Sequence, residues 1–262
     1  MKLGVIGCGT MGYALIKGFT ESGVLAKDHI LCGETNEVTV SGLQAMGYTV
    51  ADVKEAISCD AVLFSVKPYQ FKNVYDAIRT FIRKDTLIIS IMAGFTMNQL
   101  EGYFDGCPIV MLMPNTAVSV KKGMTAIVYG EKITNDHKEF IEKLASAVGN
   151  YEVIDESLHE ASMGMSGSGI AYAYMYLESM ADAGIRLGMK PEQALKFAAN
   201  SVIGACEMVL QTGQHPAKLR QDVCSPRGTT IEGILKLEEM GFRSAIQQAV
   251  KATVDKSKGN LR

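Results

Sequence analysis

Residues 3–12 read LGVIGCGTMG, an apolar run that passes directly into three spaced glycines. The run 3–6 is typical of a buried strand, and an amphipathic helical pattern follows the glycines. In such a strand–turn–helix unit Gly7 makes the tight turn, Gly9 lets the backbone approach a pyrophosphate, and Gly12 allows helix and strand to pack closely. The alternative is a packing turn without a ligand. We predict a dinucleotide site whose contacts here are Ile6, Gly7, Gly9, Thr10, Met11 and Gly12.

Glu34 follows the second apolar run, Ile30–Cys32, about twenty residues beyond Gly12. A carboxylate at this place in a dinucleotide fold accepts hydrogen bonds from the ribose hydroxyls and repels a 2′-phosphate. The loop Cys32–Val38 contains no arginine or lysine that would attract a phosphate. The residues therefore modestly favour NADH over NADPH as cofactor. An exposed glutamate that merely opens the loop before Glu37 is the alternative.

Short apolar runs alternate with helical patterns through the first half of the chain. The predicted strands are Leu3–Ile6, Ile30–Cys32, Ala61–Val66, Leu87–Met92, Ile109–Met113, Thr125–Tyr129 and Tyr151–Ile154. The predicted helices are Met11–Ser22, Glu37–Met46, Gln70–Ile82, Asn98–Phe104 and Asn135–Val148. This alternation indicates an α/β fold with a Rossmann-type, doubly wound parallel sheet that is covered by helices on both faces.

Three of the predicted strands end in small or conformationally special residues. The carboxyl ends of parallel strands face the ligand crevice of such a sheet, so we expect a flat ring and its ribose to approach here. Taken alone, each set of residues is also explained as an ordinary transition from strand to loop. The predicted cofactor contacts at these ends are Ser65, Val66, Lys67, Pro68, Met92, Ala93 and Gly94. Asn115, which follows the run Ile109–Met113, is predicted to contact the substrate.

The strand-like apolar runs stop after about Asp155, and only helical patterns follow. Pro191 stands where a helix would begin and Gly213 where it would end. Many small residues would let helices approach closely. The predicted helices are Met163–Leu187, Pro191–Thr212, Ala217–Val223, Thr230–Met240 and Phe242–Lys258. We predict two domains: a dinucleotide-binding domain over residues 1–155, and an all-helical substrate-binding and dimerisation domain over residues 156–262.

Residues 225–233 read SPRGTTIEG and lead into a helical pattern. The segment has a Ser-Pro pair, a glycine that permits a turn and two adjacent hydroxyl groups. Such a segment places backbone N–H groups at a helix N-terminus, where a small anion can bind. We expect Gly228 to adopt a positive φ, which only glycine tolerates well. A hydride carrier and a carboxylate cradle in one chain indicate a reductase of a small acid.

Composition excludes several other classes of protein. The chain has 262 residues and a net charge of −2, which gives no sign of nucleic acid or an anionic membrane as a partner. No apolar run reaches the ~20 residues of a membrane helix. The six cysteines are scattered without a metal-binding spacing, which predicts reduced thiols in a cytoplasmic protein. The four histidines form no cluster, so we expect no metal site and treat them as surface residues.

The segments GCGTMG, SVKP, MAG, MPNT, GMSGSGIAY and SPRGTTIEG occur in this order, and with them the chain resembles pyrroline-5-carboxylate reductase from Met1 to about Lys258. The resemblance implies reduction of the ring imine of 1-pyrroline-5-carboxylate to L-proline by NADPH or NADH, the last step of proline biosynthesis. It also implies an N-terminal Rossmann domain and a C-terminal helical domain that forms a homodimer, with a decameric ring of dimers as a further option.

By this resemblance the loop 225–230 holds the substrate carboxylate, and the hydroxyl of Thr230 hydrogen-bonds the ring nitrogen and relays a proton. The implied substrate-binding residues are Asn115, Ser225, Pro226, Gly228, Thr229 and Thr230, of which Thr230 is catalytic. The chain departs from the family at Arg227, where glycine is usual, and at Ile170 and Ala117, where proline is frequent. We expect the Arg227 side chain to point to solvent. The alternatives are that it holds the carboxylate or that the substrate is a different acid.

Two other functions are compatible with this two-domain pattern. A related hydroxyacid or imine reductase is the nearest, but hydroxyacid dehydrogenases of this shape resemble one another in a lysine on the long interdomain helix, and Ile170–Leu187 contains none. A non-catalytic NAD(H)-binding protein is the other, and only Arg227 favours it. Binding of the cofactor without turnover of the imine would distinguish it from an enzyme.

Overall fold

The computed structural model describes residues 1–259, so the last three residues of the predicted domain 156–262 lie outside the described chain. The described chain forms two compact units. The first comprises residues 1–167 together with the end of the last helix from Val254, and it contains the whole β-sheet. The second comprises Ser168–Thr253 and is helical.

The sheet of the first unit has eight strands in the order β3-β2-β1-β4-β5-β6-β7-β8. Their bounds are Leu3–Ile6 (β1), Ile30–Gly33 (β2), Thr49–Ala51 (β3), Ala61–Phe64 (β4), Leu87–Ser90 (β5), Ile109–Met113 (β6), Gly123–Tyr129 (β7) and Gly149–Val153 (β8). Neighbouring strands are parallel except β6 and β7, which pair antiparallel. The strand β3 was not predicted, because three residues at a sheet edge are too few to form a recognisable apolar run.

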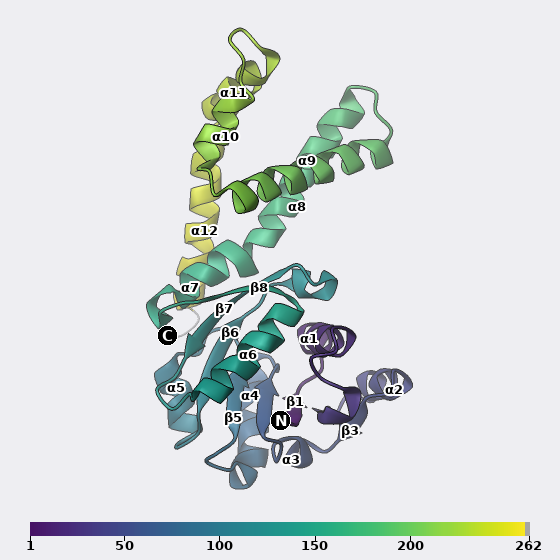
Figure 1. The fold of residues 1–262 in the computed structure, drawn as a ribbon, viewed down its shortest axis with the longest axis vertical. Coiled ribbons are helices and arrows are strands. Elements are labelled where there is room, and N and C mark those ends of the chain that lie inside the picture. The colour runs from purple at the N-terminus through teal and green to yellow at the C-terminus, as the bar shows by residue number, and fades with distance from the viewer. Residues whose placement is uncertain (260–262) are drawn as a thin grey trace. The chain divides into compact units, whose positions relative to one another are not determined.

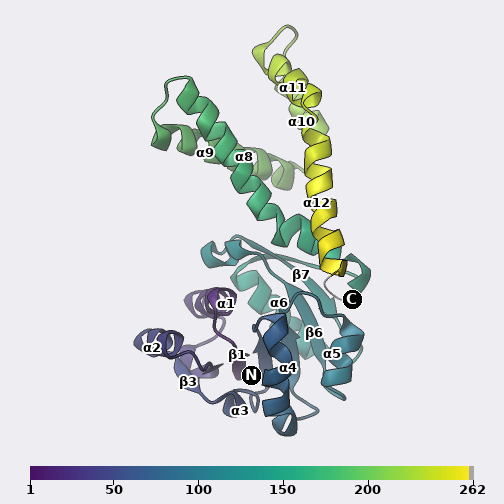
Figure 2. The ribbon, with the colours of Figure 1, turned by 180° about the vertical axis from the view of Figure 1, so that it is seen from behind.

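Helices cover both faces of this sheet, as the predicted doubly wound fold requires. The helices of the first unit are α1 (Thr10–Glu21), α2 (Glu37–Ala45), α3 (Val53–Ala56), α4 (Pro68–Ile78), α5 (Met97–Tyr103), α6 (Asn135–Ala147) and α7 (His159–Ser162). The helix α6 lies in front of the sheet in Figure 1, and α4 lies in front of it in Figure 2.

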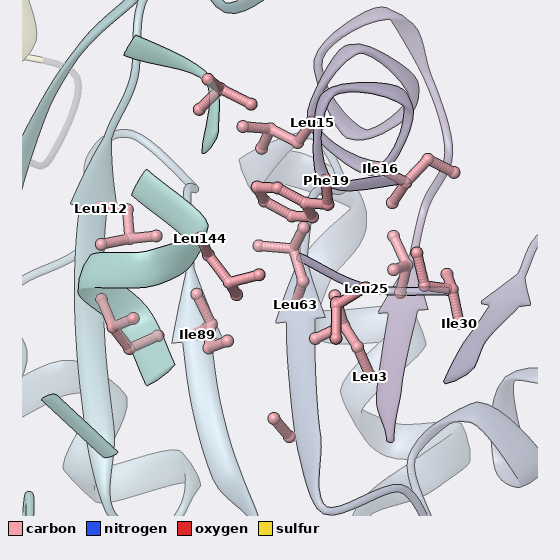
Figure 3. Close-up of a cluster of buried hydrophobic side chains, with 14 of the residues drawn as sticks. Leu3, Leu15, Ile16, Phe19, Leu25, Ile30, Leu63, Ile89, Leu112 and Leu144 are labelled. Atoms are coloured by element: carbon pink, nitrogen blue, oxygen red, sulfur yellow. The ribbon is translucent and has the colours of Figure 1, made fainter. Parts of the chain in front are cut away.

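Successive strand residues point to opposite faces, and the two hydrophobic cores follow this alternation. Leu3 and Leu63 pack with α1 and α6 in one core, whereas Ile6 and Phe64 pack with α3, α4 and α5 in the other. Figure 3 shows Phe19 of α1 directed toward the strands beside Leu63. The short apolar strands are therefore buried on both faces, which explains why they read as unbroken apolar runs.

The second unit consists of long helices that follow the predicted boundaries closely. They are α8 (Gly169–Arg186), α9 (Pro191–Thr212), α10 (Pro216–Asp222), α11 (Thr229–Glu239) and α12 (Phe242–Gly259). Pro191 occupies the first turn of α9, and Gly213 ends it in the left-handed conformation at φ 64°. The predicted helix from Met163 differs at its start, because residues 163–167 form a separate π-helical turn.

Small residues bring α8 and α9 together as the sequence predicted. A methyl group built on Gly184 would lie 3.0 Å from the Cβ of Ala194, so the two helices approach closely at this point. Within residues 168–253 the buried apolar side chains are only alanines, namely Ala181, Ala194 and Ala198. Large apolar side chains such as Phe197 and Leu210 are instead 67% and 74% exposed. No helix among residues 1–259 is long and apolar enough to cross a membrane.

Gly4 and Gly42 provide a matched test of how closely β1 and α3 approach each other. A Cβ on Gly4 of β1 would lie 1.9 Å from the carbonyl oxygen of Ala56, whereas one on Gly42 of α2 would contact nothing within 4 Å. We expect Gly4→Ala to lower the free energy of unfolding by about 3 kcal/mol, as overpacking does. Gly42→Ala should raise it by roughly 0.5–1 kcal/mol, because alanine favours a helix. Urea denaturation of both variants measures these changes, and equal effects would contradict the close approach of β1 and α3.

Candidate functional site

The glycine-rich loop joins β1 to α1, and two of its three glycines are required by the fold itself. Gly7 has φ 87°, and its N–H donates to the carbonyl of Gly33 at 3.0 Å. A Cβ on Gly12 would lie 2.6 Å from the carbonyl oxygen of Gly7, so only glycine lets α1 approach β1 here. These two positions would need glycine even in a packing turn without a ligand.

Gly9 is different, because nothing in the protein requires a glycine there. Its φ is −65°, which any residue adopts, and a Cβ built on it would meet no atom within 4 Å. It precedes α1 as the N-cap residue, and no side chain caps the helix. The first N–H groups of α1 therefore face open space that a side chain at position 9 would enter. This arrangement fits the diphosphate of a dinucleotide, which binds helix N-termini through backbone N–H groups.

Glu34 lies directly after β2 and is tied to the glycine-rich loop. Its Oε2 accepts a hydrogen bond from the N–H of Cys8 at 2.9 Å. Its Oε1 accepts from the N–H groups of Thr35 at 2.8 Å and Asn36 at 3.0 Å. Glu34 is half-buried, and its hydrogen bonds to Thr35 and Asn36 also fit the alternative of a glutamate that opens the loop before Glu37, so its contact with ribose stays a prediction. It joins the loops that follow β1 and β2, where the ribose of a dinucleotide is expected.

The thiol of Cys8 points into the core beside Cys32. A side-chain hydrogen bond with Cys32, together with burial, raises the pKa of Cys8 above its ordinary value. The Cys8 thiol therefore stays protonated, and only its backbone N–H serves the loop. The thiol is also buried in the core, away from solvent.

The residues after β4 lie against the same loop. The N–H of Ser65 donates to the carbonyl of Ile6 at 2.9 Å, and a side chain on Gly7 would collide with Val66. Lys67 and Pro68 are exposed and begin α4. The structure thus brings Ser65 and Val66 together with the glycine-rich loop, as predicted for a single crevice at the carboxyl end of the strands.

The residues after β5 and β6 occupy the same edge of the sheet. After β5, Met92 is buried, Ala93 is exposed and Gly94 turns the chain at φ 85°. After β6, the Oδ1 of Asn115 accepts from the N–H groups of Ala117 and Met124 at 3.2 and 3.3 Å. The Nδ2 of Asn115 donates to the Oγ of Ser166 at 3.1 Å. Its side chain thus connects β6 and β7 to the π-helical turn, and its predicted contact with substrate stays a prediction.

A cavity of about 480 Å³ opens beside Gly94 and Met113. Acidic side chains line it, and one of them, Glu156, accepts from the N–H of Met97 at 2.6 Å. His159 also lines it and is 6% exposed, so the expectation of a surface histidine is wrong. Its Nε2 is buried without a hydrogen-bond partner in the described chain, and burial lowers its pKa. No local signal reveals this burial, because α7 is only four residues long.

The loop 225–230 belongs to the helical unit, and its last two residues, Thr229 and Thr230, are the first residues of α11. The N–H of Gly228 donates to the carbonyl of Ser225 at 2.9 Å, which closes a tight turn. The left-handed residue of this turn is Arg227, at φ 58°, whereas Gly228 has φ −76°. The expected positive φ at Gly228 is therefore wrong, because the turn places the strained conformation one residue earlier. The Arg227 side chain is exposed.

Gly228 is needed for a different reason. A Cβ at this position would lie 2.4 Å from the Oγ of Ser225 and 3.0 Å from its carbonyl oxygen. Gly228 is the N-cap of α11, and no side chain caps the helix. Thr229 and Thr230 form its exposed first turn. The loop thus presents open N–H groups and two hydroxyls, and these donors can hydrogen-bond a small carboxylate.

Comparisons with known proteins cover the whole chain. Residues 156–260 match the family model for pyrroline-5-carboxylate reductase dimerisation, and residues 2–94 match that for NADP oxidoreductase, coenzyme F420-dependent. Pyrroline-5-carboxylate reductase from Escherichia coli K12 is 37% identical over 260 residues, covering 98% of this chain and 97% of the relative. The Plasmodium falciparum pyrroline carboxylate reductase structure with NADP bound has a TM-score of 0.90 at 27% identity, covering 100% of this chain and 98% of that one.

Residue 227 has a left-handed backbone, so we predict that glycine is more stable than alanine there, which is the reverse of the order inside a helix. Only glycine adopts this conformation without a steric cost of about 1 kcal/mol, so Arg227→Gly should be more stable than Arg227→Ala by that amount. Arg220, inside α10, is the matched control, because there alanine should be better than glycine by about 1 kcal/mol. Urea denaturation of the four variants compares their free energies of unfolding. The same order at both positions would contradict the left-handed conformation of residue 227.

Burial of His159 predicts a loss of stability in acid. Because its pKa is lowered in the folded protein, the unfolded chain binds a proton first as the pH falls below about 6.5. The free energy of unfolding should therefore fall with pH below that value, by up to about 1.4 kcal/mol per pH unit, until the folded-state pKa is reached. His159→Gln should flatten this slope, whereas His29→Gln, at an exposed histidine, should not. Denaturation at pH 5 to 8 measures the slopes, and identical slopes in all three proteins would refute the assignment.

Proposed function

This chain belongs to the pyrroline-5-carboxylate reductase family, and we propose that it reduces the ring imine of 1-pyrroline-5-carboxylate to L-proline with NADH or NADPH. The reaction is the last step of proline biosynthesis. One observation carries the proposal: the similarity extends over the full chain and includes both the glycine-rich loop and the loop 225–230. The fold alone would not identify the substrate.

The cofactor is held, in this proposal, by residues of the first unit. The open N-terminus of α1 binds the diphosphate, and Glu34 binds the adenosine ribose. Ser65–Pro68 and Met92–Gly94 lie along the path of the nicotinamide half. When bound, the nicotinamide supplies the hydride that reduces the imine carbon.

The substrate is oriented by the loop 225–230. Its carboxylate accepts hydrogen bonds from the open N–H groups of α11 and from the hydroxyls of Ser225 and Thr229, and the positive end of the helix dipole favours its charge. Pro226 shapes the start of the loop, and Gly228 keeps space that a side chain would close. Asn115 completes the set of proposed substrate-binding residues, through direct contact or through its hold on Ser166.

Thr230 is the proposed catalytic residue. Its hydroxyl hydrogen-bonds the ring nitrogen, which gains a proton as the imine becomes a secondary amine. A threonine hydroxyl is a weak acid, so it positions the nitrogen and relays a proton whose source is water. The reaction then needs no histidine or lysine from the chain, because the main task of the protein is to hold the two reactants in register.

The proposed assembly is a homodimer formed through the helical domain, which we place at residues 156–262 after a dinucleotide-binding domain at 1–155. The exposed apolar side chains of the helical unit, among them Phe197 and Leu210, support this, because a second copy would bury them. A decameric ring of dimers is the larger assembly that we propose. The free, mostly buried cysteines support a cytoplasmic location.

A hydroxyacid dehydrogenase is the main alternative, and the structure offers it no catalytic lysine on α8, whose residues 169–186 contain none. The decisive experiment is therefore direct. The purified chain should oxidise NADH or NADPH in the presence of pyrroline-5-carboxylate and form proline. Failure to turn over with either cofactor, in protein whose circular dichroism shows that it is folded, would reject the proposal and favour a non-catalytic NAD(H)-binding protein.

Removal of the Thr230 hydroxyl tests the catalytic assignment. Thr230→Val keeps the shape of the side chain but deletes the hydrogen bond to the ring nitrogen, which is charged or becomes charged during the reaction. The loss should cost about 1.5–3 kcal/mol of transition-state stabilisation, or roughly ten- to a hundredfold in kcat/KM. Thr80→Val, at an exposed threonine of the first unit, is the matched control and should leave kcat/KM unchanged. Steady-state kinetics with saturating cofactor measure both. Wild-type kinetics for Thr230→Val would remove the hydroxyl from the mechanism.

A further inference from the structure

We infer that Glu34 is the residue that selects the cofactor of this chain, and that it selects NADH against NADPH by means of a carboxylate that the backbone holds in place. The inference rests on the proposed function only in that a nicotinamide cofactor binds the glycine-rich loop. The Plasmodium falciparum pyrroline carboxylate reductase was solved with NADP bound, and residues 2–94 of this chain match a family model for NADP oxidoreductases, so the test must compare both cofactors.

The position of the Glu34 carboxylate is determined by three backbone donors from two loops. The N–H of Cys8 binds Oε2, and the N–H groups of Thr35 and Asn36 bind Oε1. Hydrogen bonds of this kind to an ionised acceptor are stronger than neutral ones. Rotation of the side chain away from this place would break all three hydrogen bonds. The side chain is therefore a fixed part of the site.

A carboxylate in this position discriminates between the two cofactors at one group. An ionised carboxylate only accepts hydrogen bonds, and its two oxygens have about four lone-pair sites, so an acceptor site remains for a ribose hydroxyl. NADH offers the 2′-hydroxyl as a donor. NADPH offers instead a phosphate with about −1.5 to −2 charge, which the negative carboxylate repels.

The loop around Glu34 contains no lysine or arginine that would attract the 2′-phosphate. The loop after Glu34 contains Thr35, Asn36 and Glu37, and the last of these adds a second negative charge at the start of α2. Lys27 and Lys54, which flank β2 and its loop in sequence, each have a contact with another residue. Lys27 donates to the carbonyl of Met46 at 2.6 Å, and the Nζ of Lys54 lies 5.7 Å from the ring centre of Phe81.

Direct binding tests the inference without any use of the imine substrate. NADH and NADPH differ only in the 2′-phosphate, and fluorescence of the reduced nicotinamide reports the binding of each to the full chain. We expect the wild-type protein to bind NADH at least about tenfold more tightly, the scale of one hydrogen bond to a charged group. Equal affinities, or tighter binding of NADPH, would overturn the inference even if the imine is reduced.

Two variants separate local selection from general charge. Glu34→Ser should reduce the NADH/NADPH ratio of affinities about tenfold or more, and part of the change should be tighter binding of NADPH. Glu37→Ser changes the net charge by the same amount at an exposed position whose carboxylate takes no part in the three hydrogen bonds that hold Glu34, and it should leave the ratio within about twofold. Equal shifts in both variants would show that the overall charge decides the preference, and would refute a role specific to Glu34.

Salt dependence provides a measurement that does not depend on any variant folding. The repulsion between Glu34 and the 2′-phosphate is Coulombic, whereas the hydrogen bond to a 2′-hydroxyl is short-ranged. Raising the ionic strength from about 0.05 to 0.5 M should therefore narrow the wild-type NADH/NADPH ratio. A ratio that widens with salt would contradict the proposed repulsion. If the protein does not reduce the imine, the binding measurements still decide the cofactor preference, so either proposal can be refuted without the other.

Discussion

The close approach of α1 to β1 is the constraint on which the rest of the first unit depends. Gly12 lies so near the carbonyl of Gly7 that no side chain fits between them, and Gly7 turns the chain through a positive φ to make this possible. The packing aims the N-terminus of α1 at the carboxyl edge of the sheet. The ends of β4, β5 and β6 lie at the same edge, which is where we propose that the dinucleotide binds.

Both proposed binding sites use the same physical device with different supports. At α1 and at α11 a glycine is the N-cap, and no side chain satisfies the first N–H groups. Gly9 stands in open space, so glycine there leaves room for an incoming group. Gly228 stands against Ser225, so glycine there serves the loop itself. A glycine in a motif is therefore not evidence of ligand approach until its surroundings are known.

The helical unit shows why a second copy is the natural completion of this fold. Its small residues let α8 and α9 pack closely, but among apolar side chains the unit fully buries only alanines, while many of its large apolar side chains remain exposed. The hydrophobic effect scales with the apolar area removed from water, so this unit by itself gains little from folding. The match of residues 156–260 to a dimerisation family agrees with this distribution.

What the sequence by itself determined are the features that depend on neighbours along the chain. The glycine-rich loop, most strand and helix positions, the place of Glu34 after β2 and the turn before α11 follow from local spacing, because propensity and periodicity act over a few residues. Only the tertiary structure decided what depends on distant residues. It reversed β7 against β6, buried His159, connected Asn115 to Ser166 and placed Cys8 against Glu34. It also moved the strained residue from Gly228 to Arg227. These outcomes arise from contacts between segments that are far apart in sequence, and no local pattern encodes them.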